Sequence, residues 1–210
     1  MMKAELYDLD GLVIHSPLPF PIGAVSEHFR VRPVNYEPPP IVPLTRDVDE
    51  TYAMSVKQIF AYIASSMRSV DRDTWYFLWE RTADIYGNTG GPNKRPWIDM
   101  TVRTLEKGLV YTRFKDIFFR PSGVSGVESK GAAILELITQ YDDVTHYDDD
   151  PWVIFGLAKA FPAEKFPGVK FILVQELDAG ILATREELER FPNVRREAWR
   201  EILNRNKRMQ

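Results

Sequence analysis

The chain has 210 residues, 44% hydrophobic and 27% charged, with a formal net charge of −3, which is the balance expected of one soluble globular domain. We expect an intracellular, cytoplasmic protein, because a strand predicted to start by Ala4 leaves no room for a signal peptide. No apolar run is long enough to span a bilayer, and the net charge gives no general reason to expect nucleic-acid binding. The absence of cysteine excludes disulfides and thiolate chemistry, and three scattered histidines disfavour a zinc centre, so any catalysis must rest mainly on carboxylates.

The chain opens on an apolar run, LYDLDGLVIHS at residues 6–16, which contains two aspartates one residue apart. The pattern predicts a strand that starts by Ala4, which leaves no room for a signal peptide ahead of it. Because side chains alternate along a strand, Asp8 and Asp10 would point the same way and repel unless a cation or hydrogen-bond donors neutralise them. The stretch is therefore either a metal site or an ordinary Asp-Gly turn, and the local pattern by itself favours the turn.

Proline dominates the next segment, since eight of the fifteen prolines lie within residues 17–43. Proline removes a backbone donor and breaks helices and central strands, so residues from about 16 to 50 are expected to form an extended insertion. Residues 55–67 then carry apolar side chains at helical spacing, which predicts an amphipathic helix.

Helices and strands are expected to alternate from residue 71 onward. Helices are predicted at residues 71–82, 96–108, 129–141 and 151–162, the first with Asp71 or Asp73 near its start. Strands are predicted at residues 83–89, 115–121, 143–150 and 168–175. Such alternation implies parallel strands with right-handed crossovers. The expected fold over residues 1–180 is therefore an α/β three-layer sandwich with a central, mostly parallel sheet.

Residues 181–210 are expected to form a C-terminal helical extension. Thr184 followed by Glu187 is a capping box, and an apolar stripe follows at Val194, Trp199, Ile202 and Leu203. Residues 184–210 hold eight Lys or Arg against five Glu, which gives a net charge of +3. This composition fits a solvated terminal helix with cations near its C-terminus, and it leaves open a tail that binds RNA or a protein partner.

Four polar groups fall where this βα order predicts turns and helix starts. They are Asp8-Leu9-Asp10-Gly11, Asn88-Thr89-Gly90, Lys130 and Asp148-Asp149-Asp150. Each has a plain structural explanation as well: Thr89 as a turn residue, Lys130 as a solvated helix residue, and the three later aspartates as an N-cap. Ser65-Ser66 is a rival for the position of Thr89, but it falls within a predicted helix.

The order of these groups resembles the haloacid dehalogenase superfamily of phosphohydrolases, whose motifs are Asp-x-Asp, a Ser or Thr, a Lys or Arg, and an acidic pair. The resemblance covers residues 4 to about 175 and implies a Rossmannoid fold with at most a small cap. A looser likeness, around TGGPNKRPW, KDIFFRP and SKG, concerns phosphatase domains of nucleic-acid end repair. It implies a nucleotide or a polynucleotide end as the phosphorylated substrate.

The resemblance also implies roles for single residues in a Mg²⁺-dependent phosphatase. Asp8 would be the nucleophile that forms an aspartyl-phosphate, and Asp10 the general acid and base. Thr89 would donate a hydrogen bond to a phosphoryl oxygen, and Lys130 would offset the negative charge gathered there. Mg²⁺ would lie between Asp8, the backbone carbonyl of Asp10 and the acidic motif, which is Asp148 or Asp149 in this sequence.

Two positions depart from the family pattern and bear on activity. Leu12 stands where Thr or Val is usual, and Gly91 follows Thr89-Gly90 where several relatives carry an arginine. Lys94 or Arg95 is the candidate to replace that arginine as an anion-binding residue near Gly90. The alternative function is a catalytically weakened protein that serves as a binding or structural subunit of a ribonucleoprotein assembly. It would contact its partner through the proline-rich loop or the C-terminal helix.

Overall fold

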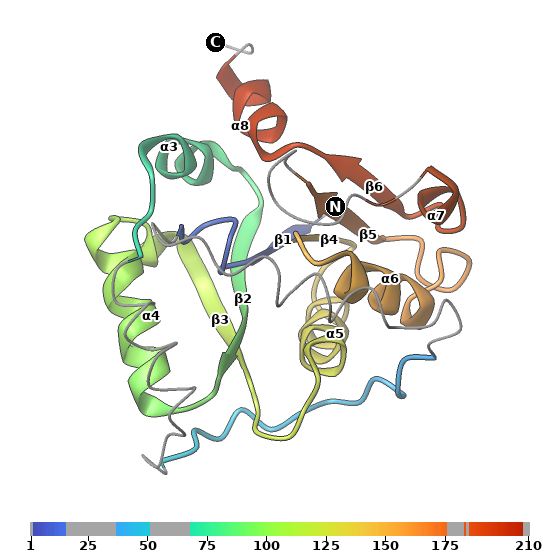
Figure 1. Cartoon of the computed structure of the whole chain (residues 1–210), viewed down its shortest axis with the longest axis horizontal. Coiled ribbons are helices and arrows are strands. Elements are labelled where there is room, and N and C mark those ends of the chain that lie inside the picture. The colour runs from blue at the N-terminus through green and yellow to red at the C-terminus, as the bar shows by residue number, and fades with distance from the viewer. Residues whose placement is uncertain (1, 16–36, 51–67, 176–182, 184, 208–210) are drawn as a thin grey trace.

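The computed structural model describes residues 2–15, 37–50, 68–175, 183 and 185–207. Within these ranges lies a six-stranded sheet in the order β3-β2-β1-β4-β5-β6, in which every pair of neighbours is parallel (Figure 1). The strands are β1 Lys3–Asp8, β2 Asp84–Pro92, β3 Phe114–Arg120, β4 Asp143–Asp148, β5 Val169–Val174 and β6 Val194–Glu197. The helices are α3 Arg72–Glu80, α4 Arg95–Lys107, η1 Tyr111–Arg113, α5 Gly126–Leu137, α6 Pro151–Ala160, α7 Arg185–Glu189 and α8 Trp199–Lys207. The predicted α/β fold with a parallel central sheet is confirmed.

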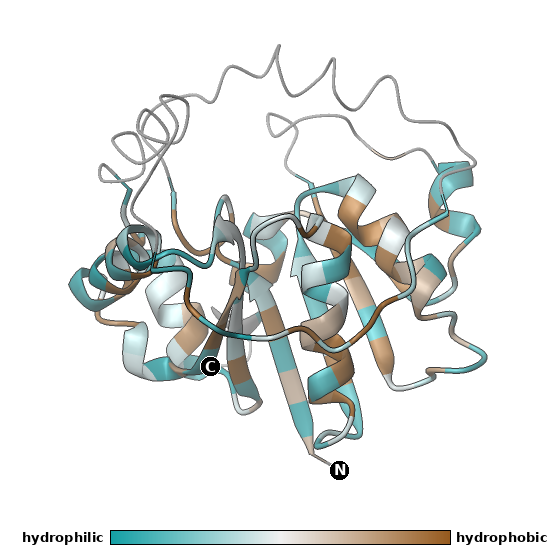
Figure 2. Cartoon of the chain, turned by 90° about the horizontal axis from the view of Figure 1, so that it is seen from below, coloured by the Kyte–Doolittle hydropathy of each residue, from teal (hydrophilic) through white to brown (hydrophobic). Residues whose placement is uncertain are grey.

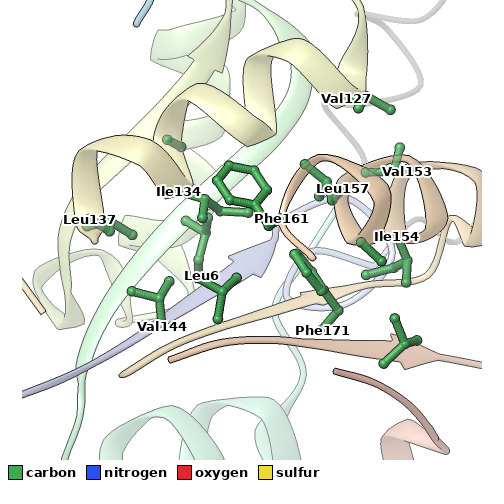
Figure 3. Close-up of a cluster of buried hydrophobic side chains, with 14 of the residues drawn as sticks. Leu6, Val127, Ile134, Leu137, Val144, Val153, Ile154, Leu157, Phe161 and Phe171 are labelled. Carbon is green, nitrogen blue, oxygen red and sulfur yellow. The ribbon is translucent and has the colours of Figure 1, made fainter. Parts of the chain in front are cut away.

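Two apolar cores, one on each face of the sheet, determine which way each strand residue points. Leu6 joins α5 and α6 in one core (Figure 3), whereas Tyr7 joins α3 and α8 in the other. Burial of one such side chain contributes about 1.5–3 kcal/mol. Because strand side chains alternate, Asp8 follows Leu6 to the face covered by α5, and Asp148 lies on that face as well.

Side-chain caps define where α3 and α5 begin. Asp71 accepts a hydrogen bond from Thr74 N at 2.7 Å and begins α3, as one of the two predicted aspartates. Helix α5 begins three residues before the predicted start at 129, because Ser125 and Glu128 form a capping box. Lys130 therefore lies in the second turn of α5 and not at the start of a helix.

The expectation of a purely helical C-terminal extension is wrong. Residues 194–197 form β6, which pairs with β5 and completes the sheet. The sequence FPN at residues 191–193 explains the break, since proline cannot continue a helix. Of the predicted stripe, Val194 belongs to β6, while the apolar side chains of α8 are buried at Trp199, Ile202 and Leu203. Thr184, the predicted cap, lies outside the described residues.

Residues 37–50 form an extended segment without helix or regular strand, which agrees with the prediction for this part of the proline-rich insertion. Figure 2 shows it crossing in front of α5, where the side chain of Ile41 lies against Gly131. Arg46 ion-pairs with Asp116 and Glu136 and anchors the segment to β3 and α5. Residues 16–36 and the predicted helix at 55–67 lie outside the described residues. None of the described helices is both long and apolar enough to cross a membrane.

Candidate active site

The first acidic segment forms a tight turn directly after β1. Val13 N and Ile14 N both donate to Leu9 O, at 3.2 and 2.7 Å, and Gly11 has a φ of +100°. The strand therefore ends at Asp8, so the expectation that alternation aligns Asp10 with it is wrong, and the two carboxylates contact different partners. A Cβ on Gly11 would lie 2.7 Å from Asp149 Oδ2. The Asp-Gly pair is thus a turn that also borders the second acidic segment.

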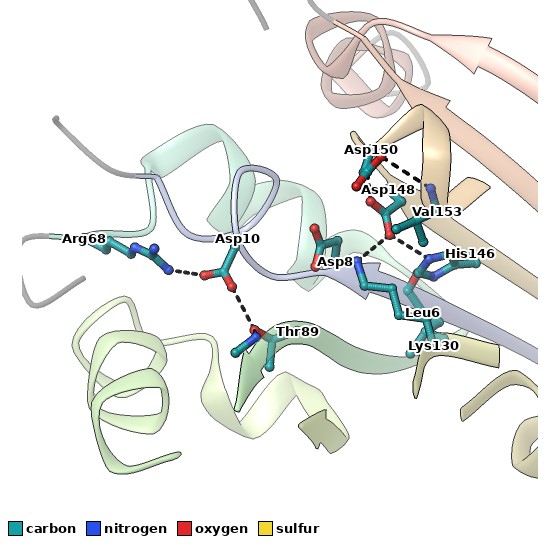
Figure 4. A network of polar contacts seen from close by, with 11 residues as sticks. Leu6, Asp8, Asp10, Arg68, Thr89, Lys130, His146, Asp148, Asp150 and Val153 are labelled. Atoms are coloured by element: carbon teal, nitrogen blue, oxygen red, sulfur yellow. Dashed lines mark hydrogen bonds and ion pairs between the residues drawn. The ribbon is translucent and has the colours of Figure 1, made fainter. Parts of the chain in front are cut away.

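Asp8, Lys130 and Asp148 form a buried charged cluster at the carboxyl edge of the sheet (Figure 4). Lys130 Nζ lies 2.5 Å from Asp148 Oδ2 and 3.1 Å from Asp8 Oδ1. Burial opposes ionisation of Asp148, but Lys130 and a contact with His146 outweigh it and hold its pKa at about 2. Burial raises the pKa of Asp8, with Lys130 opposing and the other aspartates adding to the rise. Lys130 is therefore charged, because both carboxylates raise its pKa against the effect of burial.

The carboxylates of Asp8, Asp148 and Asp149 provide a set of ligand atoms for a hard cation. One oxygen from each lies within 4.8 Å of the others. Asp8 Oδ1 is buried, and its ion pair with Lys130 is its only contact of this kind among the described residues, since no hydrogen bond reaches it. Burial and the neighbouring Asp148 raise the pKa of Asp149 to about 7, because the three carboxylates disfavour one another's charge. An all-oxygen set under this repulsion fits Mg²⁺.

Asp10 and Thr89 form a second polar group at the rim of the same edge. Thr89 Oγ1 donates to Asp10 Oδ2 at 2.8 Å and accepts from Gly91 N at 2.9 Å. Arg68 ion-pairs with the other oxygen, Asp10 Oδ1 (Figure 4). Thr89 is 2% exposed and lies within β2, so it is not a turn residue. The carboxylate of Asp10 faces these partners and does not belong to the cluster that includes Asp8.

This architecture is similar to solved structures of known proteins. A haloacid dehalogenase-like family hydrolase from Streptococcus pneumoniae matches with a TM-score of 0.53 and 13% identity, over 98% of either chain. The chain has a haloacid dehalogenase-like fold. Protein Tyrosine Kinase A from Mycobacterium tuberculosis matches with a TM-score of 0.51 and 16% identity, over 97% of this chain and 96% of that one. Neither a protein-family model nor a curated protein matches the sequence.

The HAD domain of effector protein Lem4 from Legionella pneumophila aligns over 91% of this chain and 94% of its own, with 13% identity and a TM-score of 0.41. At identities this low the likeness concerns the fold. The chemistry of the chain follows from its own side chains.

The two cations predicted to bind an anion contact other parts of the chain. Lys94 Nζ lies 3.3 Å from Asp49 and Arg95 lies 2.9 Å from Glu50, so both contact the extended segment 37–50. Leu12, the unusual residue after the first motif, is 2% exposed and packs in the core shared with α3 and α8. Gly90 has open space around its Cα, since an added Cβ would meet nothing within 4 Å.

Asp150 matches the structural explanation for its motif, because it caps α6. Its carboxylate accepts from Trp152 N at 2.8 Å and from Val153 N at 3.3 Å. Burial and Asp148 raise the pKa of Asp150 to about 6. The three consecutive aspartates therefore divide their roles: Asp148 and Asp149 face the acidic cluster, and Asp150 begins the next helix.

Two further polar residues lie on the face of the sheet that carries Asp8, although neither was predicted to have a role in the site. His146 is fully buried, with Nε2 3.0 Å from Asp148 Oδ2 and Nδ1 3.1 Å from Leu6 O. Both partners are acceptors, and burial lowers the pKa of His146, so its single proton serves one contact at a time. The sequence feature that could have indicated His146 is its position two residues before Asp148 on the same strand, because such side chains lie on the same face.

Asn88, part of the motif Asn88-Thr89-Gly90 but without a predicted role of its own, pairs in register with Asp8 on the neighbouring strand. Its side chain is fully buried, yet neither Nδ2 nor Oδ1 has a hydrogen-bond partner within the described residues. A buried amide left unpaired is destabilising. Its donor and acceptor are therefore available to a group that enters the site beside Asp8.

Proposed function

We propose that the protein is a Mg²⁺-dependent phosphatase that hydrolyses a phosphomonoester through an aspartyl-phosphate on Asp8. One observation carries this proposal: a buried carboxylate lies 3.1 Å from the ammonium of Lys130 and within 4.8 Å of oxygens from Asp148 and Asp149. Phosphoryl transfer needs this combination, because a nucleophile must approach an anion whose charge is neutralised on several sides.

In the first step a carboxylate oxygen of Asp8 attacks phosphorus, and the bond from phosphorus to the leaving-group oxygen breaks. Asp10 gives that oxygen a proton, so the alcohol leaves neutral and Asp10 becomes a carboxylate. Lys130 stabilises the charge that develops on the phosphoryl oxygens. Thr89 acts on Asp10 instead, because its single hydroxyl proton is donated to that carboxylate. Mg²⁺, held by Asp8, Asp148, Asp149 and the backbone carbonyl of Asp10, would supply further positive charge to the phosphoryl group.

In the second step water attacks the phosphorus of the aspartyl-phosphate. Asp10 takes a proton from that water, the bond between Asp8 and phosphorus breaks, and inorganic phosphate is released with Asp8 restored. Thr89 is suited to orient Asp10 for both transfers, because its hydroxyl donates to Asp10 Oδ2 at 2.8 Å. The looser sequence likeness predicts a nucleotide or a polynucleotide end as the substrate, and this stays a prediction.

The test is hydrolysis of an aryl phosphate and of 3′- and 5′-phosphorylated oligonucleotides, with Mg²⁺ and with EDTA. Asp8→Asn should lower kcat on the order of 10³-fold or more, since it removes the nucleophile. Asp99→Asn, an exposed position on α4, is the matched control and should leave kcat unchanged. When the reaction is quenched with acid, wild-type protein should carry covalently bound phosphate, and the Asp8→Asn variant should not.

Turnover that is indifferent to both EDTA and Asp8→Asn would contradict the proposal. Complete inactivity of the wild type toward all three substrates would favour the alternative function, a catalytically weakened binding or structural subunit. Titration of Mg²⁺ into the wild type and into Asp148→Asn then shows whether the acidic cluster still holds a cation.

A further inference from the structure

Arg68 is the cation that contacts the rim of the proposed site, although nothing in the local sequence singles it out. Its guanidinium ion-pairs with Asp10 Oδ1, and its side chain is only 12% exposed (Figure 4). The other oxygen of Asp10 accepts from Thr89. Both oxygens of the proposed general acid and base are thus held by side chains from distant parts of the sequence.

The backbone beside Arg68 is anchored to the core at three successive residues. Ser69 forms an antiparallel bridge with His15, with N to O distances of 2.8 and 3.0 Å. Val70 packs closely on Gly108, since a Cβ added to Gly108 would lie 2.7 Å from Val70 Cβ. Asp71 caps α3. The position of Arg68 next to the turn that follows β1 is therefore built into the fold.

The charges around the site leave a specific task for Arg68. Lys130 already contacts Asp8 and Asp148. Lys94 and Arg95 are paired with acidic residues of the extended segment. Among the contacts of the described residues, Arg68 is therefore the cation on the side of Asp10, where the leaving group has to arrive.

The chemistry of the first step brings the leaving group to this guanidinium. Asp10 can protonate the leaving-group oxygen only if that oxygen comes within hydrogen-bond reach of its carboxyl group. A neutral alcohol offers Arg68 no better partner than Asp10. An anionic substituent does, because Arg68 contacts only one oxygen of Asp10, whereas a planar guanidinium can bind a free carboxylate or phosphate through two parallel hydrogen bonds.

We propose that Arg68 binds a second anionic group on the leaving-group side of the substrate, so that the preferred substrate is a phosphomonoester carrying a further carboxylate or phosphate. This inference rests on the proposed phosphatase function and specifies its substrate class. Transfer of Arg68 from Asp10 to the substrate anion also frees one oxygen of Asp10 to exchange protons with the leaving group. Binding of the substrate anion by Arg68 and release of the Asp10 carboxyl group from Arg68 then occur together.

The test compares substrates that differ only in the second charge. Phosphoglycolate is set against ethyl phosphate, and ethylene glycol bisphosphate against 2-hydroxyethyl phosphate, which separates carboxylate from phosphate as the preferred anion. We expect wild-type kcat/KM to be roughly 30-fold or more higher for the anionic member of at least one pair. Arg68→Gln should abolish that preference, because it should lower kcat/KM far more on the anionic member of a pair than on the neutral one, and Arg68→Lys should restore part of the preference.

Arg72→Gln is the matched control, because Arg72 lies four residues away on the surface and contacts Tyr76 at 3.2 Å. It should leave both rates and preference unchanged. A readout without turnover uses phosphonates, which cannot be hydrolysed at the P–C bond by this route. Calorimetry should show tighter binding of phosphonoacetate, or of a bisphosphonate with the same spacing, than of ethylphosphonate in the wild type and equal binding in Arg68→Gln.

Several outcomes would overturn the inference. They are an absence of preference in the wild type, an equal loss on charged and neutral substrates in Arg68→Gln, and an equal gain on both, which would mark the Arg68–Asp10 pair as inhibitory. The two proposals fail separately. Arg68-dependent binding of phosphonoacetate without any turnover would refute only the phosphatase function. Turnover that depends on Asp8 but not on Arg68 would refute only the substrate class.

Discussion

The two halves of the candidate site differ in what holds them. Asp8, Lys130 and Asp148 are fully or nearly buried at the ends of β1 and β4 and on α5, and the ammonium of Lys130 pairs with both carboxylates. Asp10 and its partner Arg68 lie on a turn and beside an isolated bridge, where Asp10 is 34% exposed. The buried half depends on the sheet itself, whereas the rim half depends on short connections. Changes in the buried half should therefore affect stability and activity, and changes at the rim mainly activity.

Removal of the buried ammonium should have the largest effect. Lys130→Met leaves Asp8 and Asp148 buried without a counter-charge, which should lower the free energy of unfolding by about 3–5 kcal/mol and abolish turnover. Denaturant unfolding measures the first and the aryl phosphate assay the second. Lys170→Met is the control, because its pair with Asp143 is half-exposed and should contribute less than about 1 kcal/mol. Equal stability of the two variants would show that the buried cluster does not support the fold.

Gly11→Ala should disturb the junction between the two halves. Gly11 has a φ of +100°, and a Cβ there would lie 2.7 Å from Asp149 Oδ2. We expect a loss of about 1–3 kcal/mol together with weaker Mg²⁺ binding, measured by unfolding and by calorimetry. Gly123→Ala is a matched control for backbone strain alone, since Gly123 has a φ of +78° and no atom within 4 Å of its Cβ position. Unchanged Mg²⁺ affinity in Gly11→Ala would argue against Asp149 as a ligand.

The acidic cluster should make the stability of the metal-free protein depend on pH in two windows. Burial raises the pKa of Asp149 from 3.8 to about 7, so the folded state prefers its neutral form and stability falls as the pH rises from about 4 to 7. The pKa of Asp148 is lowered to about 2, so its contribution is present above about pH 4 and is lost as the pH falls toward 2. Thermal unfolding in EDTA should show both slopes. Asp149→Asn should reduce the upper slope and leave the part that comes from the raised pKa values of Asp8 and Asp150, and Mg²⁺ at pH 8 should raise Tm.

The sequence predicted the buried half of the site better than the rim, for a physical reason. Parallel strands deliver their carboxyl ends to one edge, so the positions of Asp8 and Asp148 follow once the strands are recognised. The cap of α3 could also be predicted, as one of the two candidates Asp71 and Asp73, because a cap and its hydrogen-bond partner lie within a few residues of each other. Arg68 could not be predicted, since its contact with Asp10 spans 58 residues and no periodic pattern marks it.

Proximity in sequence was a poor guide where long-range pairing decided the outcome. Lys94 and Arg95 follow the second motif closely, yet both contact segment 37–50, whose acidic residues no local pattern connects to them. Strand β6 escaped recognition because VRRE is four residues long and mostly charged. Its place in the sheet comes from pairing with β5, which a pattern of this length does not encode.

Substitution of Thr89 should have the smallest effect on stability among these variants. It also distinguishes most clearly the role of the rim from that of the buried half of the site. Thr89→Val keeps the buried shape but removes the hydroxyl that donates to Asp10 and accepts from Gly91 N. We expect a loss of about 1 kcal/mol in unfolding free energy and a fall in kcat of roughly 10²-fold. Thr104→Val is the matched control, because that buried hydroxyl donates only to Met100 O within α4. It should cost similar stability and leave kcat unchanged. If both variants keep full activity, Thr89 only shapes the end of β2 and the rim of the site does not orient Asp10 through its hydroxyl.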